Sequence, residues 1–248
     1  MDIADLIDAI EEQGTLLAEA ATRCHLNTSV PTCPGWSMRD LLQHIGGVHR
    51  WAAAHVAQQR PEVIGDLDEV VERWPGDAAL INWYRDGHAA LVRTLRQADP
   101  DVACFTFLPA PSPLAFWARR QAHETGIHRA DAECCSGPIT PFAPSLAADG
   151  IDELLLRFLV RPQSGLRSDP PWSLHVTATD VGAEWTVFAD ALGVVVRTEG
   201  ESGDVTVSAP ASDLYLLLWN RRTAEGLAVA GDAGLLDRWR DSVRIRWT

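Results

Sequence analysis

The sequence contains no lysine, and all 21 of its basic residues are arginine. This absence excludes every mechanism that needs a lysine side chain: Schiff-base catalysis, a lysine general base, and the phosphate-binding lysine of P-loop proteins and kinases. Strong positive charge in a functional site must therefore come from arginine or from a bound metal ion.

Acidic residues outnumber basic ones, 34 to 21, which gives a formal net charge of -13. Nucleic-acid backbones are neutralised by basic surfaces, so this balance argues against DNA or RNA as a partner. No apolar run approaches the roughly 20 residues that span a bilayer, and residues 1–5 lack the basic segment of a signal peptide. The sequence predicts a cytoplasmic protein without a membrane partner.

Cysteine is too sparse for a disulfide framework. The five cysteines form an odd set with no CxxC pair, which argues against both a disulfide scaffold and a structural zinc knot. A catalytic cysteine is a separate hypothesis, with Cys33, Cys134 and Cys135 as candidates. None of them has a recognisable nucleophile motif, and an inert buried thiol is the commoner state.

The first half of the chain has the apolar spacing of helices. Its second predicted helix begins at Ser37, which forms a capping-box pattern with Asp40, and the fourth begins at Ser112-Pro113, where proline suits the first helical position. The predicted helices cover residues 2–24, 37–58, 77–97 and 112–133. Helices of this number and length indicate a four-helix bundle.

The second half changes to a period of two after Pro170-Pro171, which indicates strands. The predicted elements are a helix over 146–160, strands over 173–178, 184–188, 193–197 and 204–208, helices over 213–222 and 235–239, and a short strand over 243–247. The fold class is therefore α+β, with an antiparallel sheet in the second part. We expect domains at 1–145 and 146–248.

The fourth predicted helix carries the densest group of ionisable side chains. Glu124 and His128 lie about 40° apart around it, and Trp117, Arg120, Gln121 and Asp131 fall on the same side. Buried charges must be paired or must bind a metal, so this face is either a metal site or, in the simpler interpretation, an exposed Glu–His pair. An HExxH zinc motif is excluded, because His123 and His128 are about 140° apart.

A metal would need further ligands, and the second predicted helix offers His44, His49 and His55. His49 lies about 140° from His44 around the helix, and His55 about 20°. Periodicity does not choose among the three. Each of them, taken singly, is more often a satisfied core histidine than a ligand.

Two segments carry a family resemblance: residues 30–45, which read Val-Pro-Thr-Cys-Pro-Gly-Trp-Ser-Met-Arg-Asp-Leu-Leu-Gln-His-Ile, and residues 117–133. Over nearly its whole length the sequence resembles the mycothiol-dependent maleylpyruvate isomerase family. The resemblance implies an N-terminal DinB-like four-helix bundle and a C-terminal α+β domain related to sterol-carrier proteins. It also implies a divalent metal, usually zinc, held by His44, Glu124 and His128. Three protein ligands with an open position are typical of catalytic zinc.

The same resemblance points to an essential arginine in the second half. The family has a glycine followed by this arginine, and aligning Asn220 with the glycine selects Arg221 as the catalytic residue. Arg222 is the neighbouring alternative. In the simpler interpretation, both arginines only stabilise the C-terminus of a helix through its dipole.

The implied activity is thiol chemistry on a small electrophile. In the family reaction mycothiol adds to the cis double bond of maleylpyruvate, the new single bond rotates, and elimination gives fumarylpyruvate. Many members of the family are better described as thiol S-transferases, and nothing in these residues selects one substrate. Mycothiol is the thiol of actinobacteria, whose GC-rich genomes agree with the absence of lysine. The implied partners are thus a low-molecular-weight thiol and an electrophilic substrate, and the sequence does not specify an oligomeric state.

A function of another class must be weighed against this activity. The apolar helix around Leu214–Leu218 and a sterol-carrier-like sheet could bind an apolar ligand, with the bundle as a scaffold. That hypothesis predicts no metal dependence and a vestigial ligand set.

Overall fold

The computed structural model describes residues 1–161, 164, 166–200 and 202–243. The chain divides into two compact units, Met1–Thr140 and Pro141–Thr248. The predicted boundary near residue 145 lies at the start of helix α5 (Pro144–Glu153), the first element of the second unit.

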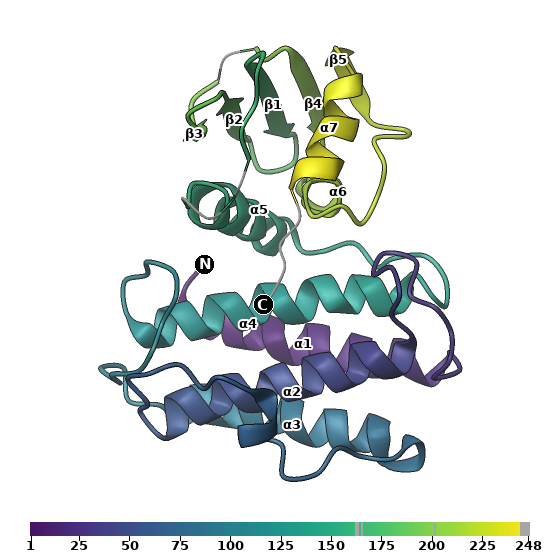
Figure 1. The fold of residues 1–248 in the computed structure, drawn as a ribbon, viewed down its shortest axis with the longest axis vertical. Coiled ribbons are helices and arrows are strands. Elements are labelled where there is room, and N and C mark those ends of the chain that lie inside the picture. Colours follow the sequence, from purple (N-terminus) through teal and green to yellow (C-terminus); the bar gives the residue numbers. More distant parts are fainter. Residues whose placement is uncertain (162–163, 165, 201, 244–248) are drawn as a thin grey trace. The chain divides into compact units, whose positions relative to one another are not determined.

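The first unit is a four-helix bundle, as predicted (Figure 1). Its helices are α1 (Ile3–Thr22), α2 (Met38–Ala57), α3 (Asp77–Gln97) and α4 (Pro113–Glu133), with a short 3-10 turn η1 (Leu67–Glu69) between α2 and α3. Helix α1 packs along α4, and α2 packs along α3 and also contacts α4. Capping boxes at Asp2 and Ser37 satisfy the free N–H groups at the starts of α1 and α2.

Helix α4 differs from the other three because it has no polar face. Nearly every residue from Leu114 to Glu133 is buried, including several that carry charge. One such charge is neutralised within the helix, because the Arg129 guanidinium donates a hydrogen bond of 2.5 Å to the Glu133 carboxylate. The same guanidinium donates to the Gln13 side chain on α1. The interpretation of Glu124 and His128 as an exposed pair is therefore wrong, since Glu124 is only 4% exposed and His128 only 8%.

The second unit is an α+β structure with a five-stranded sheet in the order β3-β2-β1-β4-β5. The strands are β1 (Trp172–Ala178), β2 (Ala183–Ala189), β3 (Val194–Arg197), β4 (Val205–Ala209) and β5 (Ala228–Gly231). All neighbouring strands are antiparallel except β1 and β4, which are parallel. The predicted α+β fold with an antiparallel sheet is confirmed, and the one parallel pair arises because the chain crosses from β3 at one edge to β4 on the far side of β1.

The helices of the second unit depart from the prediction in two places. The predicted helix over 146–160 is α5 followed by a π-helical stretch η2 (Leu154–Phe158). The predicted helix over 213–222 is α6 (Ala211–Leu218), which ends earlier because Asn220 adopts a left-handed φ of 62° that stops a helix. The last helix is α7 (Gly234–Ser242), and the strand predicted over 243–247 lies outside the described residues except for Val243. Among the described residues, none of the helices combines the length and apolar character needed to cross a bilayer.

Candidate metal centre

Helices α2 and α4 bring three potential ligands together. The His44 Nε2 atom on α2 lies 3.3 Å from Glu124 Oε1 on α4, and His128 Nε2 lies 3.3 Å from the same oxygen. One ligand atom from each residue falls within 4.8 Å of the others. Both imidazoles contact the same carboxylate oxygen, so the structure groups the three side chains that the resemblance implied as ligands.

The other two histidines of α2 point elsewhere. The His49 Nε2 atom lies 2.9 Å from the hydroxyl of Thr125, and the ring is fully buried. His55 stacks on Trp117 and lies edge-on to Trp51 in an aromatic cluster. Burial lowers the pKa of both rings, to about 4 for His55. Both are therefore neutral core histidines, which answers the question that periodicity left open.

The spacing of the three side chains fits a divalent metal. Zinc bonds to imidazole nitrogen and carboxylate oxygen are about 2.0–2.1 Å long, so adjacent donors of a tetrahedral site stand about 3.3 Å apart. The distances from His44 Nε2 and from His128 Nε2 to Glu124 Oε1 are both 3.3 Å. Two imidazoles and one carboxylate also form a donor set that catalytic zinc uses. The residues present therefore fit a metal with one coordination position left for another molecule.

The electrostatics of the cluster favour charge separation. Burial alone would raise the pKa of Glu124, but hydrogen bonds from both histidines and the nearby Arg120 guanidinium hold it well below its usual range. Burial also opposes protonation of His128, yet hydrogen bonds, led by that to Asp131, raise its pKa well above the ordinary value. A metal that binds here must displace the His128 proton, so its affinity should rise with pH.

Asp131 orients His128 from the side away from the cluster. Its Oδ2 atom lies 2.9 Å from His128 Nδ1, and the carboxylate is fully buried. An imidazole whose Nδ1–H is held in this way presents its Nε2 lone pair to a metal. The same carboxylate accepts hydrogen bonds from the Thr32 hydroxyl at 2.6 Å and the Cys33 thiol at 3.3 Å. Helical spacing placed Asp131 on the correct face, but these loop contacts had no signal in the sequence.

The cysteines near this carboxylate act as hydrogen-bond donors. Cys134 and Cys135 both donate to the Asp131 carbonyl oxygen, and burial raises the pKa of Cys135 to about 12. Cys33, His128 and Asp131 also stand close enough to form a second group of potential ligands. In that second group the histidine ligand atom would be Nδ1 of His128, which already forms a hydrogen bond with Asp131. The geometry gives no support to a nucleophilic thiolate at Cys33, Cys134 or Cys135.

Loss of the Asp131 carboxylate should weaken metal binding. We expect Asp131→Ala to lower zinc affinity about 10- to 100-fold, because His128 loses the partner that fixes its tautomer and ring orientation. Competition with a chromogenic chelator measures this change. Asp8→Ala is the matched control, since its exposed carboxylate pairs with Arg96 at the surface. Equal zinc affinity for Asp131→Ala and Asp8→Ala would contradict the role of Asp131.

Arg221 follows the left-handed turn that ends α6. The Asn220 N–H bonds to the Leu217 carbonyl and the Arg221 N–H to the Leu216 carbonyl, which is the Schellman arrangement that glycine usually completes. Asn220, which has a left-handed backbone conformation, thus occupies the position where the resemblance implies a glycine. The Arg221 guanidinium donates a hydrogen bond of 2.8 Å to the Trp219 carbonyl oxygen.

Arg222 is held by a different set of contacts. Its guanidinium pairs with Asp213 and donates to the carbonyl oxygens of Thr223 and Glu225. Its own carbonyl accepts a hydrogen bond from Arg240. These contacts close the turn after α6, so Arg222 has a structural task.

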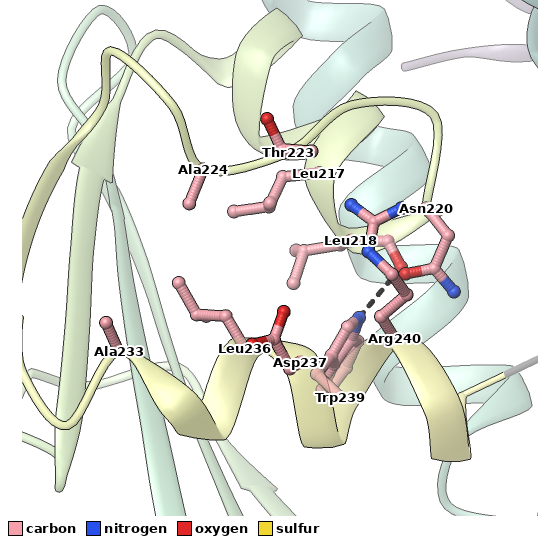
Figure 2. Close-up of a pocket in the computed structure, with 10 residues that line it drawn as sticks. All are labelled: Leu217, Leu218, Asn220, Thr223, Ala224, Ala233, Leu236, Asp237, Trp239 and Arg240. Carbon is pink, nitrogen blue, oxygen red and sulfur yellow. Dashed lines mark hydrogen bonds between the residues drawn. The ribbon is translucent and has the colours of Figure 1, made fainter.

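A small cavity of about 120 Å³ lies between the end of α6 and α7. Figure 2 shows Leu217 and Ala224 facing Leu236 across it, with the Asp237 carboxylate turned toward the space. Leu218, Asn220, Thr223, Ala233, Trp239 and Arg240 complete the lining. The cavity is mostly apolar and has the size of a short aliphatic group.

Fold and site together define a class: a two-part chain in which a four-helix bundle with a His–Glu–His cluster precedes a smaller α+β unit. Comparison with family models identifies the family. Residues 7–133 match the mycothiol maleylpyruvate isomerase N-terminal domain, and residues 145–238 match the MDMPI C-terminal domain. The chain belongs to the mycothiol-dependent maleylpyruvate isomerase family.

Two solved structures share the fold. The crystal structure of the mycothiol-dependent maleylpyruvate isomerase aligns with a TM-score of 0.62 and 12% identity, covering 93% of each chain. A variant of that enzyme with one histidine replaced by alanine gives a TM-score of 0.66, again at 12% identity and 93% of each chain. Comparison with the curated protein sequences found no match. The TM-scores show a shared fold, and at this low identity the likeness shows the fold alone.

Proposed function

We propose that this protein is a metal-dependent enzyme that uses mycothiol as a thiol cofactor or co-substrate on an electrophilic small molecule. The observation that carries the proposal is the His44–Glu124–His128 cluster, whose spacing fits a divalent ion and leaves one position for a further donor. The match of both halves to the family supports the choice of mycothiol and of an isomerase or S-transferase reaction.

The chemistry begins with activation of the thiol. A free thiol has a pKa of about 8.5 and is mostly protonated at neutral pH. Zinc, when bound, supplies the positive charge that favours the thiolate. Glu124, His44 and His128 would hold the ion, and the hydrogen bond to Asp131 keeps His128 Nε2 available as a ligand. A thiol bound at this site would therefore be held as a thiolate, the form in which its sulfur is nucleophilic.

The next step forms a bond between sulfur and an electrophilic carbon. In isomerisation the sulfur adds to a cis double bond, the resulting single bond rotates, and elimination restores the double bond and releases the thiol. In S-transfer the sulfur stays on the product. An arginine suits the carboxylate of such a substrate, because its planar guanidinium binds carboxylates in bidentate fashion. We assign this task to Arg221, which follows the left-handed Asn220 at the position where the family resemblance implies an essential arginine.

Thiol dependence tests this function. Zinc-loaded protein is incubated with maleylpyruvate, and separately with a panel of electrophiles, with and without mycothiol. We expect turnover only with the thiol: fumarylpyruvate if the protein is an isomerase, or a thioether product if it is an S-transferase. Equal turnover with and without mycothiol would contradict the cofactor assignment.

A second candidate function rests on the cavity of the C-terminal unit, whose apolar walls suit a short aliphatic ligand. It is the apolar-ligand-binding alternative, with the metal ligands vestigial. Isothermal titration with short alkyl compounds, before and after chelation, separates the two functions. Tight binding that is indifferent to chelation, in a protein with no thiol-dependent activity, would favour this second function.

A further inference from the structure

The two histidines of the cluster differ in what orients them. His128 has the Asp131 carboxylate behind its Nδ1 atom. Among the described residues, His44 has no hydrogen bond besides the one to Glu124. Imidazoles that bind metals almost always donate their other N–H to a fixed acceptor, because the torsion that turns the ring is otherwise soft. Something else must therefore fix the His44 ring.

The indole of Trp36 is in place to do so. Its ring lies 4.9 Å from the His44 ring, centroid to centroid, at an interplanar angle of 58°. It also stacks on His128, at 6.0 Å and 17°. The two imidazoles meet edge-to-face at 5.0 Å, so the three rings form one packed group. Trp36 is half-buried, and its indole packs on both imidazoles of the candidate site.

The loop that carries Trp36 is rigidly held. The Val30 N–H donates to the Trp36 carbonyl, and the Trp36 N–H donates to the Cys33 carbonyl, which closes a tight loop around Gly35 with its left-handed φ of 88°. Ser29 and Ser37 form a β-bridge across its base. An indole mounted on such a loop has little freedom to move away from the imidazoles.

The loop is also tied to both helices that supply ligands. Ser37 caps the start of α2, seven residues before His44 in the sequence. On the other side, Thr32 and Cys33 donate to the Asp131 carboxylate of α4. The carboxylate that orients His128 is therefore one of the two anchors of the loop that packs on His44. Movement of the loop would disturb both histidines together.

We propose that Trp36 is a positioning residue that orients His44 by ring packing, the task that Asp131 performs for His128 by hydrogen bonding. The proposal rests on the proposed function in one respect, namely that the cluster binds a metal. Trp36 itself donates nothing to the ion. Its contribution is the flat surface that restricts rotation of the His44 ring.

The test compares Trp36→Leu, which removes the aromatic ring, with Trp36→Phe, which retains a smaller one. Trp74→Leu is the matched control, because Trp74 is also a partly exposed tryptophan of the bundle but packs on Trp83. Two properties are measured on each protein: zinc affinity by chelator competition, and the visible absorption spectrum of the cobalt(II)-loaded protein, which reports ligand geometry.

We expect Trp36→Leu to lower zinc affinity about 10- to 100-fold, the range seen when an orienting partner of a ligand is lost, and to alter the cobalt spectrum. Trp36→Phe should recover most of the affinity, and Trp74→Leu should match the wild type. A Trp36→Leu protein with wild-type affinity and spectrum would overturn the positioning role, as would equal losses in Trp36→Leu and Trp36→Phe. A wild-type protein that binds no zinc would instead refute the metal site on which the proposed function depends.

Discussion

His44→Ala is expected to lower zinc affinity by more than about 100-fold, beyond the 10- to 100-fold typical of an outer hydrogen-bond partner, and to abolish mycothiol-dependent turnover. Removal of His44 leaves only Glu124 and His128, two ligands from one helix, and the ion loses its link to α2. Activity and affinity should fall together because the thiol is activated only at the loaded site. Chelator competition measures the affinity, and product formation measures the turnover.

His49→Phe is the informative control for that variant. It retains an aromatic ring on the same helix but removes both ring nitrogens, including the one bonded to Thr125. The variant leaves the Thr125 hydroxyl unpaired and should lose about 1–3 kcal/mol of stability, while it binds zinc with wild-type affinity. Full metal retention in His44→Ala, or metal loss in His49→Phe alone, would show that the ligand from α2 has been assigned to the wrong histidine.

Arg221→Met should reduce kcat/KM on a carboxylate-bearing substrate by about 100- to 1000-fold, because the substrate carboxylate loses its charged, hydrogen-bonded partner. Zinc affinity should not change, because Arg221 belongs to the C-terminal unit and the ligands to the bundle. Arg221→Lys should recover part of the activity, since it restores the charge without the planar fork. Steady-state kinetics at saturating mycothiol measure the effect.

Arg222→Met is the matched control for that prediction. Arg222 pairs with Asp213 and closes the turn after α6, so its loss should lower thermal stability more than activity. If instead Arg222→Met abolished turnover in a folded protein while Arg221→Met remained active, the alignment of Asn220 with the family glycine would be wrong by one position.

The helices of the bundle could be predicted from the sequence because their signals are local. The capping pattern at Ser37 and the proline at 113 mark where α2 and α4 begin, and the apolar spacing of each helix marks its buried face. The sheet was harder, since pairing depends on residues far apart in the chain. Nothing near Val205 indicates that β4 pairs in parallel with β1, and the short Ala-Val-Ala-Gly segment of β5 has no recognisable pattern.

The same distinction holds for the candidate site. Helical spacing placed Glu124, His128 and Asp131 on one side of α4, but it could not choose between His44 and His49, because the choice depends on how α2 faces α4. The packing of Trp36 on both imidazoles was equally inaccessible, since it depends on where a loop lies against two helices. The rigid proline- and glycine-containing segment before Ser37 was the one sequence signal that could have directed attention to it.

The proposed function requires that the His–Glu–His cluster hold a metal ion and that this ion bind a thiol as thiolate. Addition of mycothiol to the cobalt(II)-loaded protein tests this directly, because a sulfur bound to cobalt gives an intense charge-transfer absorption band that a free thiol does not. We predict that the band appears, saturates at one thiol per metal, and is absent in His44→Ala. A stoichiometrically loaded wild-type protein whose spectrum does not change with mycothiol would contradict the claim.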